Sequence, residues 1–166
     1  MSAQAWIPAY VGLGSNLDDP RARIAEACAS LAGLPGSRFV LRSSLYRTPP
    51  FGPVAQPDFV NAVAALLTQL PPRELLAALK QIETRMGRTA PIVRWGPRRI
   101  DLDLLAYGDV TLEEPGLTLP HPGIAERAFV LVPLAEIAPD LLVPRVGRAS
   151  RLLGRVDSSA VVRLHE

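Results

Sequence analysis

Two aspartates one residue apart, Asp101 and Asp103, stand in the run "DLDLL" directly after the arginine-rich stretch "RWGPRR". A strand reverses its side-chain direction at every residue, so both acids would share one face while Leu102 and Leu104 point into a core. Carboxylates about 7 Å apart repel unless a cation, a proton or arginines lie nearby. Such a pair can hold Mg²⁺, which binds through one or two carboxylates plus substrate phosphates. The alternative is a pair of solvated positions on an ordinary strand.

Arginines gather close to these acids. Seventeen of the eighteen basic residues are arginine, Lys80 being the exception, and five arginines crowd into fifteen residues: Arg85, Arg88, Arg94, Arg98 and Arg99. Such a cluster indicates an anionic ligand. Metal on one side of the phosphate oxygens and guanidinium on the other would suit a triphosphate.

A third group of residues is suited to a flat heterocycle. Asn61 stands early in an otherwise apolar strand, where a buried amide must find partners, and Phe51 and Phe59 precede it. Aromatic rings can stack on a planar ligand while an amide hydrogen-bonds its edge. A structural hairpin loop would explain the neighbouring prolines but explains Asn61 poorly. His121 is either a turn residue or, together with Arg127, another anion contact.

The stretch "GLGSN" lies between a predicted strand and a predicted helix. It matches neither common glycine-rich phosphate motif. We therefore expect a tight turn that needs positive φ, in which Ser15 or Asn16 makes local hydrogen bonds.

Composition favours a soluble globular protein of one domain. The chain has 166 residues, of which 48% are apolar and 20% charged. No apolar run is long enough to cross a bilayer, and the first ten residues lack the features of a secretory signal, so we expect a cytoplasmic protein without a membrane partner. Cys28 is the only cysteine, which excludes a disulfide within the chain.

The order of predicted elements indicates the fold. We expect a strand over 9–13, a helix ending near Gly33, strands within 37–48 and 58–70, a helix over 71–87 and a strand over 99–107. A turn at Gly108 and Asp109 would join the last strand to "VTL" in a hairpin. This order predicts an α+β ferredoxin-like sandwich, an antiparallel sheet with helices packed on one face and additional C-terminal strands and helix. Residues 1–166 would form a single domain with a motif-bearing core over about 8–144, and the sequence leaves the packing of the tail 145–166 open.

Seven stretches together resemble the 6-hydroxymethyl-7,8-dihydropterin pyrophosphokinases of the folate pathway, which transfer pyrophosphate from ATP to a pterin alcohol. They are "GLGSNL", "SSLYRTPPFGP", "QPDFVNA", "IETRMGR", "RWGPRRIDLDLL", "LTLPHP" and "RAFVLVPLAEIAP". They cover about residues 10–140 in the family's order. The resemblance implies a monomeric enzyme that uses ATP and two Mg²⁺ ions and binds no nucleic acid.

The resemblance also assigns roles to individual residues. It implies that Asp101 and Asp103 bind metal and take part in catalysis with Arg88 and Arg98 of a mobile loop. The residues implied in pterin binding are Thr48, Pro49, Phe51, Phe59, Asn61, Trp95 and Phe129. Those implied in ATP binding are Lys80, Glu83, Arg88, Trp95, Arg98, Leu104, Thr118, His121 and Arg127.

Two other functions use the same fold or the same residue types. A metal-dependent nuclease or phosphodiesterase would normally recruit more carboxylate or histidine ligands than this strand offers. An RNA-binding module would need aromatic platforms in strand centres, and aromatic residues make up only 5% of the chain.

Overall fold

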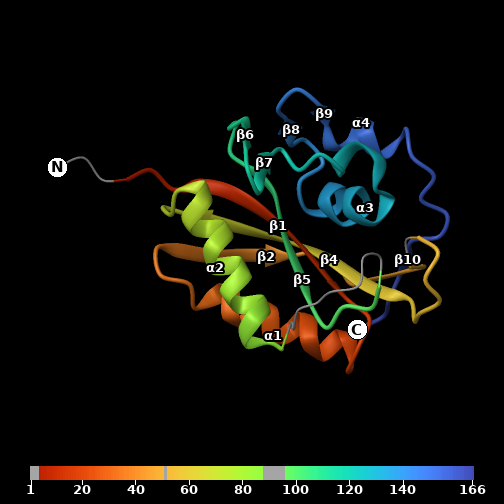
Figure 1. Cartoon of the computed structure of the whole chain (residues 1–166). Coiled ribbons are helices and arrows are strands. Elements are labelled where there is room, and N and C mark those ends of the chain that lie inside the picture. Colours follow the sequence, from red (N-terminus) through yellow and green to blue (C-terminus); the bar gives the residue numbers. More distant parts are fainter. Residues whose placement is uncertain (1–3, 51, 88–95) are drawn as a thin grey trace.

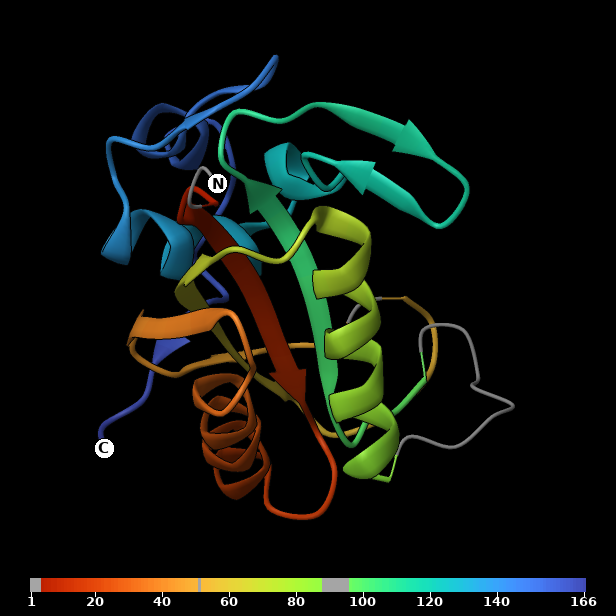
Figure 2. The same ribbon diagram turned by 90° about the vertical axis from the view of Figure 1, so that its left-hand side faces the viewer.

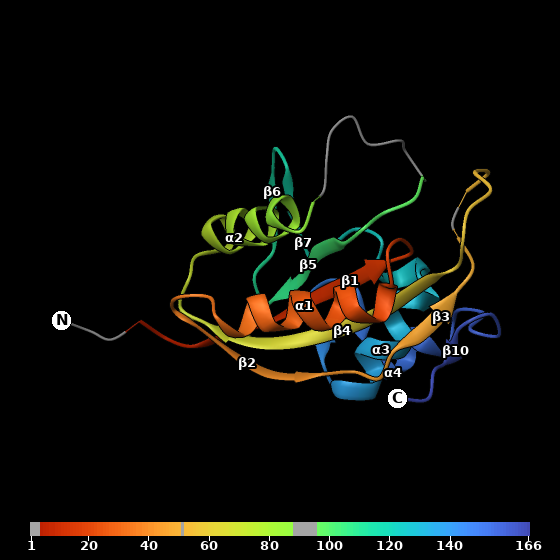
Figure 3. The same cartoon turned by 90° about the horizontal axis from the view of Figure 1, so that it is seen from below.

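The computed structural model of the chain describes residues 4–50, 52–87 and 96–166. Its main element is a six-stranded sheet in which every paired neighbour is antiparallel. The strand order is β10-β3-β4-β1-β5, and β2 pairs with β4 along the same edge as β3. Figure 1 labels these strands apart from β3, which is labelled in Figure 3. The strands are β1 (Ile7–Ser15), β2 (Ser37–Arg42), β3 (Tyr46–Thr48), β4 (Phe59–Thr68), β5 (Asp101–Tyr107) and β10 (Val162–Arg163).

One face of this sheet carries the larger hydrophobic core. Alternate residues of β1, among them Val11 and Leu13, point to this face and are at most 2% exposed. Two helices cover it, α1 (Pro20–Ala32) and α2 (Pro72–Arg85), as Figure 3 shows from below. Helix α2 contributes Leu75, Leu79 and Ile82, which recur at the spacing of one helix face.

The opposite face is covered by α3 (Ala128–Ile137) and α4 (Ala149–Leu153). The sequence-based expectation of helices on one face is therefore correct only for α1 and α2. The reason lies in the sequence of α3, "AFVLVPLAEI", which is apolar almost all round and needs a second buried surface. It finds that surface on the sheet, where Leu131 and Leu134 pack with Val63 and Leu105.

The predicted hairpin after β5 is wrong in its pairing. The chain turns at Gly108, whose amide donates to the Pro8 carbonyl, and the next strand, β6 (Leu112–Glu114), does not return along β5. It pairs with β7 (Leu117–Leu119) in a separate ribbon, drawn in teal in Figure 2. The ribbon turns at Gly116, whose φ of 79° explains why glycine stands there.

The rest of the chain adds short elements around α3. They are η1 (Ile124–Glu126), β8 (Leu142–Val143) and β9 (Gly147–Arg148), the last two paired with each other. The tail ends against the sheet, because β10 pairs with β3. None of the helices in the described ranges is both apolar enough and long enough to cross a membrane.

We predict that Leu79→Ala lowers the free energy of unfolding by about 2–5 kcal/mol, because it leaves a cavity between α2 and the sheet. Leu79 is 0% exposed. The matched control is Leu142→Ala at a leucine that is 65% exposed, which should change stability by less than about 0.5 kcal/mol. Urea denaturation measures both, and equal effects would contradict this description of the core.

Candidate active site

The two aspartates of β5 share one face of the sheet, as predicted. Between and beside them, Ile100, Leu102 and Leu104 are at most 4% exposed, whereas Asp101 is half-buried and Asp103 is exposed. Their face is the one that carries α3. In the strand order β4-β1-β5, Asp101 is level with Gly14 on β1 and, beyond it, with Asn61 on β4. Residues directly opposite in antiparallel strands point to the same side, so the carboxylates and the amide share this face.

Two glycines keep the space between the carboxylates and the Asn61 amide open. Gly12 lies beside Asp103 and Gly14 beside Asp101, both inside β1. A Cβ built on Gly14 would stand 2.8 Å from Oδ1 of Asn61, so the Asn61 amide lies over the bare backbone. The tight turn expected at "GLGSN" is therefore wrong. Among the described non-glycine residues of this region, positive φ occurs only afterwards, at Asp18 and Asp19.

The amide of Asn61 is held from its other side. Its Nδ2 donates to Oγ1 of Thr48 at 2.6 Å, and both residues are at most 8% exposed. Thr48 is paired across the strands with Phe59. Three residues for which sequence reasoning expected the edge and face of a heterocycle therefore lie together.

These groups line one cleft of about 220 Å³. It includes the described residues expected to bind the pterin, both aspartates and two arginines. Its lining is Thr48, Pro49, Phe59, Asn61, Gly96, Arg98, Asp101, Asp103, Arg127 and Phe129. The cleft thus has aromatic and amide groups together with paired carboxylates and cations.

The two arginines that line the cleft come from different segments of the chain. Nε of Arg98 lies 3.6 Å from Oδ2 of Asp101, and these side chains are 15% and 31% exposed. Arg127 precedes α3, and its guanidinium carbon lies 5.8 Å from the centre of the Phe129 ring, within cation–π range. Both cations can therefore act on an anion that enters beside the aspartates.

Asn16 joins two segments that border the cleft. Its Nδ2 donates to Oε1 of Gln56 and to the carbonyl of Pro57, each at 2.9 Å, while its Oδ1 accepts from the Arg98 amide at 2.8 Å. Oγ of Ser15 donates to the Arg99 carbonyl at 2.6 Å. The hydrogen bonds expected to be local are thus mainly between distant segments, which spacing in the sequence did not indicate.

His121 lies next to the cleft without lining it. Its amide donates to the Leu105 carbonyl at 2.8 Å, and its Nδ1 accepts from the Gly123 amide at 3.0 Å. Burial, together with the charge of Arg127, holds the pKa of His121 below its usual value although Asp103 acts in the opposite direction. The imidazole is therefore mainly neutral at neutral pH.

Other residues expected at a nucleotide site lie outside this cleft. Glu83 is buried in α2, and its Oε2 accepts from the Leu102 amide at 2.8 Å, which attaches α2 to β5. The Leu104 side chain belongs to the core under α1 and α2, while Lys80 and Thr118 are exposed. Their roles in ATP binding stay predictions. Phe51, Arg88 and Trp95 fall outside the described residues, as does most of the predicted mobile loop from Arg88 to Arg98.

The donors present fit magnesium. Within the described part of the chain, no group of three or more His, Cys, Asp or Glu side chains could hold a metal ion. Asp101 and Asp103 therefore stand as a pair of hard oxygen donors. Mg²⁺ typically binds one or two carboxylates and takes its remaining ligands from water and substrate phosphates. A softer metal would need histidine or cysteine ligands that this pair lacks.

Comparison with known proteins agrees with this geometry. Residues 10–139 match the family model described as 7,8-dihydro-6-hydroxymethylpterin-pyrophosphokinase. The chain belongs to this family.

Curated relatives resemble the chain over nearly its whole length. The 2-amino-4-hydroxy-6-hydroxymethyldihydropteridine pyrophosphokinase of Methylorubrum extorquens is 48% identical over 94% of this chain and 98% of its own. The protein of the same name from Pseudomonas aeruginosa is 47% identical over 93% and 95%.

A solved structure shares the fold at low sequence identity. The wild-type HPPK-DHPS of Plasmodium falciparum with pteroate superposes with a TM-score of 0.71 at 16% identity. The match covers 93% of this chain and 43% of that one, so the chain spans less than half of that protein.

We predict that Gly14→Ala displaces the Asn61 amide, because the added Cβ cannot stand 2.8 Å from its Oδ1. The expected cost in unfolding free energy is about 1–3 kcal/mol. In NMR spectra the side-chain amide signals of Asn61 should shift.

Gly12→Ala is the matched control on the same strand and the same face. Its Cβ would meet the Leu105 side chain at 3.5 Å, an ordinary contact. The Asn61 signals should therefore stay at their wild-type positions. Equal shifts in the two variants would show that Gly14 has no special relation to Asn61.

Proposed function

We propose that this protein transfers the pyrophosphoryl group of ATP to the hydroxyl of 6-hydroxymethyl-7,8-dihydropterin, which yields AMP and the pterin diphosphate in folate biosynthesis. The family membership supports this activity. One structural observation carries it further: the cleft places an amide and two phenylalanines beside two carboxylates and two arginines. A heterocycle and a polyphosphate must meet in such a reaction, and each group of residues suits one of them.

The pterin ring would bind in the aromatic part of the cleft. Phe59 and Phe129 come from different elements, β4 and α3, and both line the cleft. Rings on two sides of a flat ligand bury its faces, and Asn61 would hydrogen-bond its polar edge. Because Thr48 already fixes the Asn61 amide, little side-chain freedom would be lost on binding.

The polyphosphate would lie toward Asp101 and Asp103. The hydroxyl oxygen of the pterin attacks the β-phosphorus, the bond from this phosphorus to the α,β-bridging oxygen breaks, and AMP leaves while the hydroxyl proton passes to water. Arg98 and Arg127 stabilise negative charge on the transferred group and the leaving group. Mg²⁺ held by Asp101 and Asp103 would supply Lewis-acid polarisation of the phosphate oxygens.

Arg98 changes its partner in this proposal. In the structure it pairs with Asp101. The two carboxylates repel, and the guanidinium offsets part of that repulsion. With magnesium and ATP bound, the carboxylates have the metal as counter-ion, so Arg98 can turn its N–H groups to a phosphate.

Several finer features are part of the same proposal. We infer that the fold is a ferredoxin-like sandwich forming a single domain, that two Mg²⁺ ions bind, and that the protein works as a monomer in the cytoplasm. The antiparallel sheet supports the inferred fold, and the pair of carboxylates supports the binding of magnesium. A metal-dependent nuclease is less well supported, because the cleft has few acidic ligands and its aromatic residues would have no role.

The direct test mixes the protein with Mg²⁺, ATP and the pterin alcohol and identifies the nucleotide product by chromatography. We expect AMP and the pterin diphosphate in equal amounts. Formation of ADP, or the absence of any nucleotide product, would falsify pyrophosphoryl transfer.

We predict that Asp103→Asn lowers kcat by roughly a hundredfold or more, because one oxygen donor to the cation loses its charge. Asp103 is exposed, so the unfolding midpoint should not fall. Asp109→Asn, at an exposed aspartate after the other end of β5, is the control and should retain full turnover. Wild-type turnover in Asp103→Asn would remove the support for the metal assignment.

A further inference from the structure

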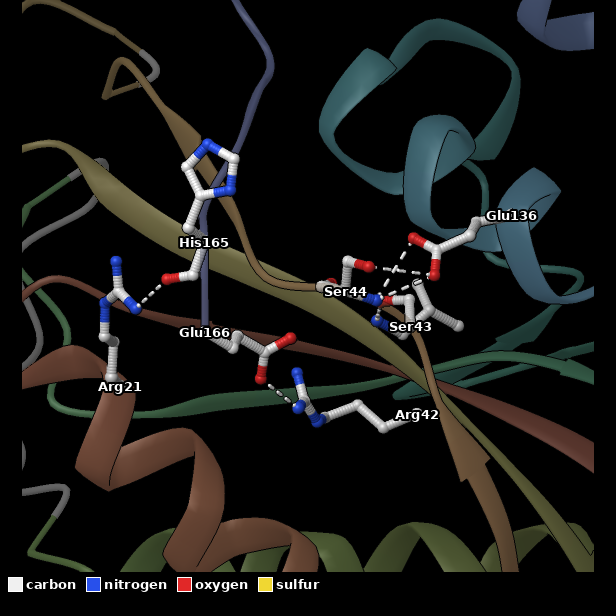
Figure 4. A network of polar contacts seen from close by, with 8 residues as sticks. Arg21, Arg42, Ser43, Ser44, Glu136, His165 and Glu166 are labelled. Carbon is white, nitrogen blue, oxygen red and sulfur yellow. Dashed lines mark hydrogen bonds and ion pairs between the residues drawn. The ribbon is translucent and has the colours of Figure 1, made fainter.

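A second polar cluster lies outside the cleft, where α3 meets the chain just before β3. The carboxylate of Glu136 accepts hydrogen bonds from the Ser44 amide at 2.9 and 3.1 Å, from Oγ of Ser44 at 3.1 Å and from the hydroxyl of Tyr46. Figure 4 shows Glu136 reaching from α3 to Ser44. Ser44 and Tyr46 are 9% and 6% exposed. This carboxylate does not line the cleft, so the proposed chemistry leaves it without a role.

The cluster and the cleft lie at opposite ends of the same two elements. Phe129 and Glu136 are seven residues apart on α3, which places them on one side of the helix about 10 Å apart along its axis. Tyr46 and Thr48 are two residues apart on β3 and therefore share a face. Each element thus carries a cleft residue at one end and a member of the cluster at the other.

The protonation states of the cluster are fixed at neutral pH. Partial burial alone would raise the pKa of Glu136, but hydrogen bonds from Tyr46 and Ser44 and the charge of Arg163 outweigh it and hold this pKa below its usual value. Burial and the Glu136 carboxylate raise the pKa of Tyr46 to about 12. Glu136 therefore stays ionised and Tyr46 stays a donor, which keeps their hydrogen bond charge-assisted.

The C-terminal segment closes the cluster from the far side of β3. Arg163 is paired with Tyr46 in the ladder between β10 and β3, and the Leu164 amide donates to the Leu45 carbonyl at 2.8 Å. Beyond it, the His165 carbonyl accepts from Arg21 at 2.8 Å and Glu166 pairs with Arg42 (Figure 4). The short strand β3 is thus held by β4, by β10 and by the Glu136 carboxylate.

We propose that Glu136 is a positioning residue for the pterin half of the active site. It acts through α3, which carries Phe129, and through β3, which carries Thr48. It thereby sets the distance between the Phe129 ring and the hydrogen-bonded pair of Thr48 and Asn61. This inference rests on the proposed function, because it assigns the pterin to that half of the cleft. Of the charged residues proposed to hold the nucleotide, Asp101, Asp103 and Arg98 lie on β5 and the segment before it, which the cluster does not touch. Arg127 stands at the beginning of α3 and is the exception.

The test compares the Michaelis constants for the two substrates in Glu136→Gln. The neutral amide should weaken the hydrogen bonds from Ser44 and Tyr46. A small shift of Phe129 relative to Thr48 and Asn61 should then raise the KM for the pterin roughly tenfold. The KM for ATP should rise much less, because Asp101, Asp103 and Arg98 do not lie on α3 or β3. The control is Glu113→Gln, at an exposed glutamate on the separate β6–β7 ribbon, which should leave both constants unchanged.

A second variant covers the possibility that Glu136→Gln folds poorly. Tyr46→Phe removes only the hydroxyl that donates to Glu136 and should raise the same constant in the same direction. Its matched control is Tyr107→Phe. The hydroxyl of Tyr107 donates to the Leu70 carbonyl at 2.6 Å, and this residue does not line the cleft. A purely structural role would lower the amount of active enzyme and leave the KM values unchanged.

The outcomes separate the two proposals. Wild-type enzyme that forms no AMP would overturn the proposed function itself. Wild-type enzyme that forms AMP, while Glu136→Gln and Tyr46→Phe both keep the wild-type KM for the pterin, would overturn only the positioning role. Equal increases in the KM for both substrates would also overturn it, because the effect would then not be confined to the pterin half.

Discussion

The site depends on a single constraint, which is that two carboxylates must share an open sheet face with a buried amide. Antiparallel pairing in the order β4-β1-β5 aligns Asn61, Gly14 and Asp101. Any side chain larger than hydrogen on Gly14 would meet the Asn61 amide, so β1 gives up a side chain where the cleft needs space. The same strands bury Val11, Leu13 and Leu104 on their other face, so the core that stabilises the sheet also fixes the direction of the functional groups.

Opposite charges occur in the cleft in equal number, since two arginines line it together with two aspartates. Arg98 lies beside Asp101, and Arg127 stands over the Phe129 ring at the beginning of α3. Two acids with two nearby cations form a nearly neutral site, which avoids the cost of holding like charges together. A magnesium polyphosphate carries both positive and negative charge. When it binds, the cation can pair with the aspartates and the phosphates can pair with the arginines. The charges that line the cleft therefore suit its proposed ligand.

Local pattern was sufficient for much of this arrangement. The alternation of "DLDLL" predicted the shared face of Asp101 and Asp103, and helical spacing predicted the helices that became α1 and α2. The pairing of β6 with β7, the second covered face and the reach of Asn16 to Gln56 and Arg98 were not predicted. These features depend on which segments meet in space, and spacing along the chain carries no signal for that. The two glycines of β1 differ from these features, because the sequence does carry a signal for them. Had "GLGSN" been assigned to the strand, the period of two would have placed Gly12 and Gly14 on one face.

The most direct measurement is a crystal structure of the protein with Mg²⁺, the pterin alcohol and an ATP analogue in which a methylene group replaces the α,β-bridging oxygen. We expect the pterin ring between Phe59 and Phe129 with Asn61 at its edge, and the β-phosphate facing the pterin hydroxyl beside Asp101 and Asp103. A pterin bound elsewhere, or phosphates that lie away from both carboxylates, would contradict the central claim that this one sheet face brings the two substrates together.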